Sequence, residues 1–329
     1  MKIAIVRDQS RAEFLPGEEG IQEDRQHKIT MGHIKEALKD TYEVIDLIMD
    51  HNLIENLDRE KVDLVFNLCN GIKGEASLIQ LPSLLEFEDI DYTGSAPLGH
   101  GIAYNKIYSG KIFKASGIAT PGFIQVNSIE ELDDIKLSFP LLVKPKDEGS
   151  SRGIQDDSLT FDRESLIEKV KEGLETYNPP MMVMEYIEGT EFTVGVLGNG
   201  DDIRILPILE IDFSRLPEEL NKIYSFEAKF EYDKYITYHI PARVDEETYK
   251  KISETAIKAF NSLGLRDYSR VDIRLKDGVP YVIEINSLPG LDRYNSDIIK
   301  MAEAEGMDYD TLIKTIVNIS KERIRKERA

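Results

Sequence analysis

The sequence predicts an α/β protein that begins with a parallel sheet and continues into α+β units. Residues 2–95 alternate between short apolar runs and helical segments, which is the pattern of a parallel sheet covered by helices. Residues 268–286 instead contain two runs of alternating apolar and polar residues around Asp277-Gly278. That second pattern predicts an antiparallel hairpin with one buried face.

Composition limits the function classes. The chain has 329 residues, which is enough for two or three domains, and 41% hydrophobic content is typical of a protein with a sizeable core. A net charge of −20 argues against a nucleic-acid partner, because no basic excess exists to displace counterions. Cys69 stands alone, so no intramolecular disulfide forms. With no signal-peptide pattern and no run of about 18 apolar residues, we expect a cytoplasmic protein without a membrane partner.

The first part of the chain is expected to form the parallel sheet. We expect strands at residues 3–6, 42–48 and 64–68, and helices at residues 28–40 and 75–87. Ligands approach such sheets at the carboxyl ends of the strands. The candidate ligand loops are therefore residues 8–26, 70–75 and 94–95.

A Gly/Ser-rich loop follows the second group of elements. A helix opens at Asn105-Lys106 and ends near Gly117, and a strand at residues 139–145 contains Lys144 near its end. Residues 146–153 follow directly, and backbone N–H groups in such a loop can cradle a phosphate. A plain hairpin connection is an equally good interpretation of this loop alone.

The remaining elements are expected to be a helix at residues 162–175, strands at 181–186 and 191–197, and helices at 245–262, 296–304 and 309–325. Residues 204–240 are poor in strand patterns, and residues 227–230 are expected in a long ordered loop. Long loops of this kind often serve as lids. The five histidines show no metal-ligand spacing, and Cys69 is interpreted as a buried apolar residue.

The hairpin carries the first chemical hypothesis. A three-residue loop at 277–279, with Gly278 in the left-handed conformation, would set Asp272 opposite Glu284 and Arg270 opposite Asn286. Two carboxylates in opposed positions repel each other unless a cation lies between them. Oxygen ligands of these types suit Mg²⁺. The alternative is a polar hairpin face exposed to water.

Six motifs, taken in order, resemble the ATP-grasp superfamily and within it the D-alanine–D-alanine ligase family. They are Lys106, Lys144 with the loop Glu148-Gly149-Ser150-Ser151, the segment Glu185 to Glu191, Glu227-Ala228-Lys229, Arg270-x-Asp272 and Glu284-x-Asn286-x-x-Pro289-Gly290. The resemblance implies a pre-ATP-grasp domain over residues 1–104 and two ATP-grasp subdomains, over 105–187 and 188–329, that clasp ATP between them.

The resemblance also implies residue roles. The nucleotide-binding set would be Lys106, Lys144, Glu148, Ser150, Ser151, Glu185, Tyr186, Ile187, Glu191 and Lys229. Two Mg²⁺ ions, with Mn²⁺ as an alternative, would bind to Asp272, Glu284 and Asn286. The catalytic set would be Arg270, Ser150, Lys229 and the backbone of Gly290.

The implied activity is an ATP-dependent carboxylate–amine ligation of two small amino acids through an acyl phosphate, in peptidoglycan biosynthesis, by a homodimer. The alternatives are a ligase of the same fold for another amino acid, dipeptide or hydroxy acid, and a non-catalytic ATP-binding protein. Retention of every metal ligand and phosphate lysine argues against the last.

Several departures from the family pattern concern the amino-acid pockets. Residues 7–10, 69–71 and 291–296 differ from the usual motifs, and Arg152 replaces a small apolar residue. The candidate substrate residues are Glu23 for the substrate ammonium, Phe230 in place of a tyrosine, and Asn295.

Overall fold

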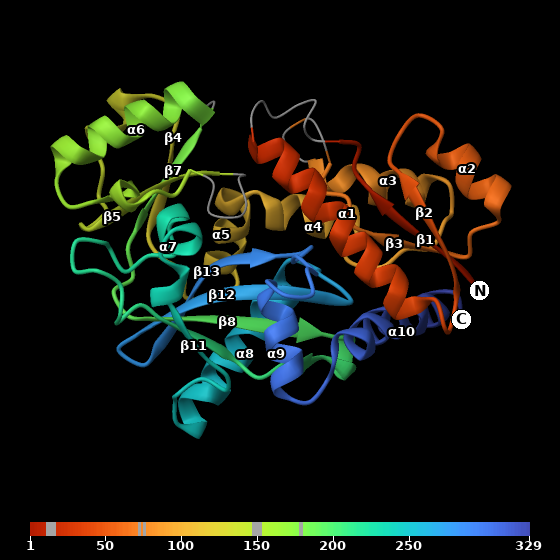
Figure 1. Ribbon diagram of the computed structural model, residues 1–329. Coiled ribbons are helices and arrows are strands. Elements are labelled where there is room, and N and C mark those ends of the chain that lie inside the picture. The colour runs from red at the N-terminus through yellow and green to blue at the C-terminus, as the bar shows by residue number, and fades with distance from the viewer. Residues whose placement is uncertain (11–17, 72–73, 75–76, 147–152, 178–179) are drawn as a thin grey trace.

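The described residues form three separate sheets, which Figure 1 shows as one unit on the right and two on the left. This structure is a computed structural model, and it describes residues 1–10, 18–71, 74, 77–146, 153–177 and 180–329. A parallel sheet followed by two antiparallel sheets agrees with the predicted fold class. Glu75, Glu148, Ser150, Ser151 and Arg152 lie outside the described residues.

The first sheet has the strand order β2-β1-β3 and is parallel throughout. Its strands are β1 (Lys2–Arg7), β2 (Glu43–Ile48) and β3 (Leu64–Asn67). The helices of this part are α1 (Glu18–Leu38), α2 (Leu53–Glu60), α3 (Gln80–Phe87) and α4 (Pro97–Tyr104). The predicted helix at 28–40 begins ten residues earlier than expected, and α2 and α4 were not predicted.

The second sheet is antiparallel with the order β4-β7-β5-β6. Its elements are α5 (Lys106–Ala115), β4 (Phe123–Val126), β5 (Leu141–Pro145), β6 (Leu159–Thr160), α6 (Arg163–Tyr177) and β7 (Met181–Glu185). The helix α5 begins where predicted because the Asn105 side chain accepts hydrogen bonds from the backbone of Ile107 and Tyr108. This cap fixes the orientation of the first residue of the helix, Lys106.

The third sheet has the order β11-β10-β8-β12-β13, with β9 paired to β8. Its strands are β8 (Thr190–Leu197), β9 (Arg204–Ile205), β10 (Leu209–Asp212), β11 (Thr237–His239), β12 (Tyr268–Lys276) and β13 (Val279–Asn286). Its helices are α7 (Phe226–Phe230), α8 (Glu246–Ser262), α9 (Asp297–Ala304) and α10 (Tyr309–Glu327). The helix α8 packs against β8, β12 and β13.

Two predictions for residues 204–240 are wrong. The segment is not poor in strands, because it contributes β9, β10 and β11. Residues 227–230 are not a loop, because they lie in α7, where the Ser225 side chain accepts a hydrogen bond from Ala228 N at 3.1 Å. A capping serine satisfies an otherwise free N–H group of the first turn.

The predicted hairpin loop is also wrong, although the predicted register near its far end is confirmed. Asp277 and Gly278 have φ of 51° and 74°, and Lys276 pairs with Val279, so the loop has two residues and not three. Positive φ at both central residues is the mark of a type I′ turn. A β-bulge between Asp272 and Ile273 restores the missing residue, and Asp272 still lies opposite Glu284.

The bulge leaves Ile283 without an opposed partner in the ladder. The Ile283 side chain packs against a small cluster of Ile107, Met182 and Met184, which come from α5 and β7 of the second sheet. Ile283 therefore takes no part in the pairing of the two strands, and its side chain provides an apolar contact between the second and third sheets.

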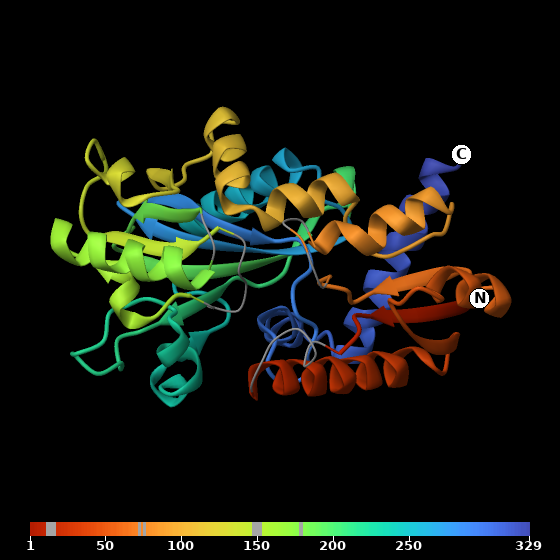
Figure 2. The same ribbon diagram turned by 90° about the horizontal axis from the view of Figure 1, so that it is seen from above.

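The first and third sheets share one hydrophobic core. Ile5 and Phe66 of the first sheet, Leu209 of the third, and Ile313 and Val317 of α10 belong to one buried cluster. The helix α10 lies against α1, and both views in Figures 1 and 2 show the two helices side by side. The last helix of the chain thus covers the first sheet.

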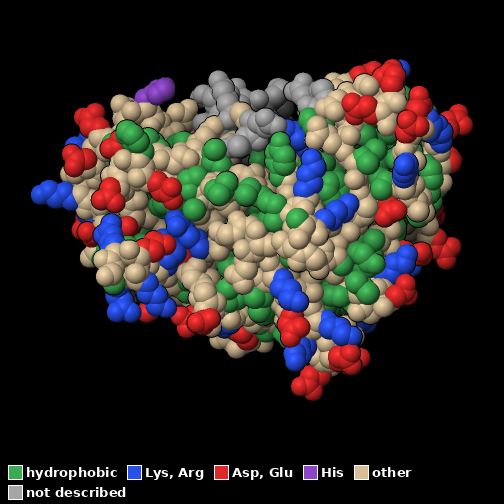
Figure 3. Space-filling model, turned by 180° about the vertical axis from the view of Figure 1, so that it is seen from behind, with side chains coloured by type: hydrophobic (Ala, Val, Ile, Leu, Met, Phe, Trp, Pro, Cys, Tyr) green, Lys and Arg blue, Asp and Glu red, His purple; other side chains and the backbone are tan. Residues whose placement is uncertain are grey.

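Charged side chains of both signs are interspersed over the face of the molecule that Figure 3 shows. The net charge of −20 is therefore not accompanied by a continuous basic surface on that face.

Candidate nucleotide and metal site

The polar ledge lies at the paired strands β12 and β13. Asp272 Oδ1 accepts hydrogen bonds from Thr193 Oγ1 at 2.6 Å and from Arg270 Nε at 3.0 Å. Its Oδ2 accepts from Arg270 at 2.9 Å and from Asn286 Nδ2 at 3.1 Å. The predicted ledge residues Arg270, Asp272 and Asn286 are therefore in direct contact, and Thr193 on β8 is an additional partner that the sequence analysis missed.

Two lysines from the second sheet reach the other carboxylate. Lys144 Nζ lies 3.5 Å and Lys106 Nζ 3.8 Å from Glu284 Oε2. Burial alone would raise the pKa of Glu284, but Lys106, Lys144 and Arg270 outweigh burial and lower this pKa to about 2. Glu284 is therefore ionised at neutral pH. The backbone N–H of Lys106 also donates to Lys146 O at 3.0 Å, which ties the start of α5 to the end of β5.

Arg270 and Lys229 concentrate positive charge beside the ledge. The acidic partners Asp272 and Asp297 outweigh the effect of burial and raise the pKa of Arg270. Burial and the nearby Arg270 guanidinium lower the pKa of Lys229, whose Nζ lies 5.7 Å from the centre of the Tyr224 ring. The short helix α7 thus brings its lysine to the same region as β12. Such a group of cations suits an anionic ligand that carries more than one charge.

The predicted adenine-contacting residues lie at the end of β7 and in the segment that connects β7 to β8. The Glu185 side chain accepts from Gly122 N at 3.1 Å and from Ser138 N at 2.9 Å, so it holds neighbouring backbone rather than projecting freely. Glu191 pairs with Arg274, whose Nε lies 3.0 Å from Glu191 Oε2. Arg274 was not predicted as a site residue, although its place two residues after Asp272 on one face of β12 was a usable signal.

Comparison with known proteins decides the family. The family model described as "D-ala D-ala ligase C-terminus" matches residues 112–318. The D-alanine–D-alanine ligase of Carboxydothermus hydrogenoformans is 34% identical over 322 residues, covering 93% of this chain and 97% of that protein. The chain belongs to the D-alanine–D-alanine ligase family. The ligase of Fervidobacterium nodosum is 35% identical, again covering 93% of this chain and 97% of that protein.

Solved structures agree with this family. The D-alanine–D-alanine ligase of Bacillus anthracis complexed with ATP superimposes with a TM-score of 0.78 at 25% identity, and 100% of each chain is covered. The VanG D-Ala:D-Ser ligase of Enterococcus faecalis gives a TM-score of 0.74 at 21% identity, covering 97% of this chain and 99% of that one, and shows the same fold. As a member of the family, the chain is an ATP-dependent ligase that uses a divalent metal and forms a peptide-like bond.

The loop after Gly290, which contains the predicted substrate residue Asn295, is in contact with α1. Asp292 Oδ1 accepts from Asn295 N and Asn295 Nδ2, each at 2.8 Å, and Gln26 of α1 donates to Asp292 Oδ2. A side chain at Gly290 would place its Cβ 3.2 Å from Ser296 Oγ, so the loop passes close to its own start. The predicted residue Asn295 is thus fixed by Asp292, which the sequence analysis did not single out.

The side chains of Glu23, the predicted ammonium-binding residue, and of Phe230 lie outside the described part of the structure. The neighbouring Asp24 is described, and it accepts hydrogen bonds from Lys28 and Arg7 at 2.7 and 3.4 Å. These partners lower the pKa of Asp24, with Lys28 the largest cause. Asp24 therefore places a carboxylate directly after Glu23 in α1.

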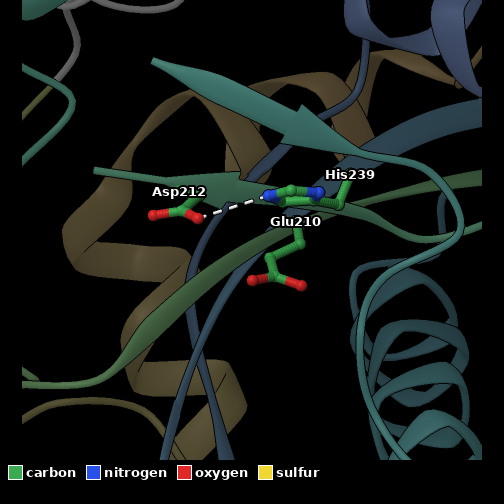
Figure 4. A group of neighbouring side chains, drawn as sticks. All are labelled: Glu210, Asp212 and His239. Carbon is green, nitrogen blue, oxygen red and sulfur yellow. Dashed lines mark hydrogen bonds and ion pairs between the residues drawn. The ribbon is translucent and has the colours of Figure 1, made fainter. Parts of the chain in front are cut away.

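A further acidic cluster lies away from the ledge. Glu210 and Asp212 of β10 and His239 of β11 are close enough to share a cation. His239 Nε2 lies 3.2 Å from Asp212 Oδ2, and Figure 4 marks this contact with a dashed line. Arg243 already neutralises both carboxylates, with contacts of 2.5 Å to Glu210 and 2.8 Å to Asp212. Hydrogen bonds from Ser214 and Arg243 lower the pKa of Asp212. We interpret this cluster as an ion-pair network that joins β10 and β11.

No helix of the described chain is both long enough and apolar enough to cross a membrane.

Proposed function

We propose that this chain is a D-alanine–D-alanine ligase, which joins two D-alanine molecules while ATP is converted to ADP and phosphate. The observation that carries the proposal is the meeting of Lys106 and Lys144 with Glu284, directly across the hairpin from the Asp272–Arg270 pair. Cations and carboxylates that alternate in this way suit a polyphosphate and its metal ions. The relatives that cover 93% of the chain carry the name of this ligase.

The residues present fit a divalent metal. The donor set consists of two carboxylates, Asp272 and Glu284, and the amide of Asn286, and such hard oxygen ligands suit Mg²⁺. The low pKa of Glu284 keeps this carboxylate ionised and ready to bind a cation. We propose that two Mg²⁺ ions bind to these three residues, where they would neutralise the charge of the ATP phosphates and the transferred phosphoryl group.

In the first step, the γ-phosphoryl group of ATP passes to a carboxylate oxygen of the first D-alanine, which releases ADP. The two reactants are both anions, so the main work of the protein is to neutralise and align them. Lys106 and Lys144 bind the phosphates from the side of the second sheet, and Lys229 binds them from α7. The products of this step are an acyl phosphate and ADP.

In the second step, the amine of the second D-alanine attacks the acyl carbon, phosphate leaves and the amine loses a proton. An oxyanion forms at the acyl oxygen during the attack. Arg270 and the backbone N–H of Gly290 stabilise this charge. Arg270 is held in place for that role by its two hydrogen bonds to Asp272.

The remaining assignments belong to the same proposal. Glu185, Tyr186 and Ile187 line the adenine, Glu191 binds the ribose, and the loop residues Glu148, Ser150 and Ser151 contact the phosphates, with Ser150 also near the reacting groups. Residues 1–104, 105–187 and 188–329 are the domain and the two subdomains. The protein acts in the cytoplasm, as a homodimer that associates through its first domain, and light scattering after size exclusion tests the dimer.

The test of the proposal is ADP release with a panel of single acceptors and donors. Purified protein with Mg²⁺ and ATP is given D-alanine alone, or D-alanine together with L-alanine, D-serine or D-lactate. The products are identified by mass spectrometry. D-alanine alone should give the dipeptide and one ADP per dipeptide. ADP release only with another substrate would assign a different ligase, and no ADP release with any substrate would contradict ligase activity.

The hydroxy-acid alternative is tested at Phe230. A phenylalanine at this position is a point of resemblance to ligases that accept D-lactate. The other ligases carry a tyrosine there, whose hydroxyl this chain lacks. One such hydrogen bond contributes about 1 kcal/mol, which changes substrate preference several-fold without loss of catalysis. Phe230→Tyr should raise the ratio of amine to hydroxyl acceptor use at neutral pH. An unchanged ratio with retained activity would remove Phe230 from acceptor selection.

A further inference from the structure

Arg274 is a buried cation to which the proposed mechanism gives no role. It lies on the same face of β12 as Arg270 and Asp272, at two-residue intervals. Its side chain is 5% exposed. Its guanidinium lies 4.5 Å from the centre of the Tyr186 ring, in the segment that connects the second and third sheets. The position is therefore at the joint between the two sheets that flank the nucleotide.

The hydrogen bonds of Arg274 all go to the same region. NH1 donates to Ile187 O at 2.9 Å, and NH2 donates to Lys222 O at 2.6 Å. Nε and NH2 lie 3.0 and 2.9 Å from Glu191 Oε2. A buried ion pair contributes little to stability, because the loss of hydration offsets the attraction. Four directed contacts to one region therefore favour a role in orientation.

Only one oxygen of the Glu191 carboxylate, Oε2, contacts Arg274. Both Arg274 nitrogens contact Oε2, and Oε1 has no hydrogen-bond partner among the described residues of the chain. The carboxylate is largely buried, with 16% of its side chain exposed, so its orientation is fixed rather than averaged by solvent. A carboxylate oxygen held in this way is suited to accept a hydrogen bond from a ligand hydroxyl.

Arg274 also reaches the segment that leads to α7. The Lys222 carbonyl that it contacts accepts a second hydrogen bond from Tyr186 OH at 2.8 Å. The preceding residue, Asn221, is held by Asp156 of the second-sheet unit, through contacts of 2.7 and 3.0 Å. Residues 221 and 222 are thus fastened from both sides just before the helix that carries Lys229.

We propose that Arg274 is a positioning residue that turns Glu191 Oε1 toward the ribose hydroxyls and joins this carboxylate to the segment before α7. The inference rests on the proposed function, because it requires a nucleotide between the two subdomains. It adds a determinant of ribose recognition that lies outside the phosphate and metal residues. Without Arg274, the carboxylate has no fixed direction and the ribose hydroxyls contribute less to affinity.

The experiment compares the binding of ADP and 2′,3′-dideoxy-ADP by calorimetry, in the presence of Mg²⁺. The wild-type protein should bind the dideoxy nucleotide about tenfold more weakly, as expected for the loss of hydrogen bonds to a charged group. In Arg274→Lys and Arg274→Met this ratio should fall to about twofold or less. Glu191→Gln should lower the ratio similarly, and the double variant Glu191→Gln/Arg274→Met should show no additional loss.

The control is Arg204→Met, which removes a 2.7 Å ion pair to Glu305 at the opposite end of β8. This variant should keep the wild-type ratio. Arg274→Lys keeps a positive charge beside Glu191, so it decides the question if Arg274→Met fails to fold. Wild-type ratios in Arg274→Lys would overturn the inference, as would equal binding of both nucleotides by the wild-type protein. If the wild-type protein binds neither nucleotide, the proposed function itself fails.

Discussion

Lys144 Nζ lies 3.5 Å from Glu284 Oε2, and the lysine side chain is only 2% exposed. The lysine comes from β5 of the second sheet and the glutamate from β13 of the third, so this contact joins the two units between which we propose that the nucleotide binds. Burial lowers the pKa of Lys144, and Glu284 partly opposes this effect. Each group therefore supports the charged form of the other.

The first prediction concerns nucleotide affinity. Lys144→Ala should raise the KM for ATP by about tenfold or more and change kcat less, because it removes the buried cation that we propose binds phosphate. Steady-state ADP release at varied ATP concentration measures both constants. Lys171→Ala, at an exposed position of α6, is the control and should behave as wild type. An unchanged KM for ATP would exclude Lys144 from phosphate binding.

The second prediction concerns the metal ledge. Glu284→Gln keeps the shape of the side chain but removes a charged ligand, so kcat should fall by at least about a hundredfold. The variant should also need a higher Mg²⁺ concentration for half-maximal ADP release. Circular dichroism checks the fold, and Glu303→Gln at an exposed position of α9 is the control. Near-normal ADP release by Glu284→Gln would remove the ledge from the mechanism.

The third prediction concerns stability at low pH. The folded protein lowers the pKa of Glu284 from 4.5 to about 2, so the ionised form stabilises the fold. This contribution, about 3 kcal/mol at most, is fully present above pH 4.5 and is lost as the pH falls through about 2. The difference in unfolding free energy between wild type and Glu284→Gln, measured with urea and no metal, should shrink over that window. A pH-independent difference would mean that Glu284 titrates normally.

The fourth prediction concerns the junction of the first and third sheets. Asp267 is fully buried and accepts hydrogen bonds from Arg323 at 2.9 Å, Ser320 at 2.7 Å and Gly94 N at 2.8 Å. Arg323→Met should lower the unfolding free energy by about 3 kcal/mol or more, because it leaves a buried carboxylate without its cation.

The control for that change is Arg325→Met on the same helix, where the pair to Glu322 is exposed. Exposed pairs contribute about 1 kcal/mol or less. Equal losses in the two variants would show that the Asp267 network does not hold the two units together.

Local sequence patterns predicted the register of the β12–β13 hairpin better than its turn. Asp272 and Glu284 were expected in opposed positions, and they are, because alternation of buried and polar residues fixes which side chains share a face. The turn was wrongly expected to have three residues, since the sequence does not show whether the extra residue lies in the turn or in a bulge. Its position depends on Ile283, whose side chain packs against Met182 and Met184, about a hundred residues away in the chain.

The missed elements have other physical causes. The helix α4 contains two glycines, Gly99 and Gly101, which weaken any helical pattern, and its Pro97 start is a weak signal alone. The strands β10 and β11 are four and three residues long, and they pair across the segment that contains α7. The spacing after Asp272 was the only signal for Arg274, because two of its partners are the backbone carbonyls of Ile187 and Lys222, which carry no sequence signature.

The helix α10 has a consequence for the order in which the protein can fold during synthesis. Ile316 and Val317, near the end of the chain, complete the buried cluster that contains Ile3 and Ile5 of the first strand. Arg323 also donates to Tyr92 O at 2.8 Å, across 231 residues. The first sheet therefore leaves the ribosome long before α10, the helix that covers it. Its apolar face stays exposed until α10 has been translated, and an exposed apolar face of this kind makes a partly folded chain prone to aggregation.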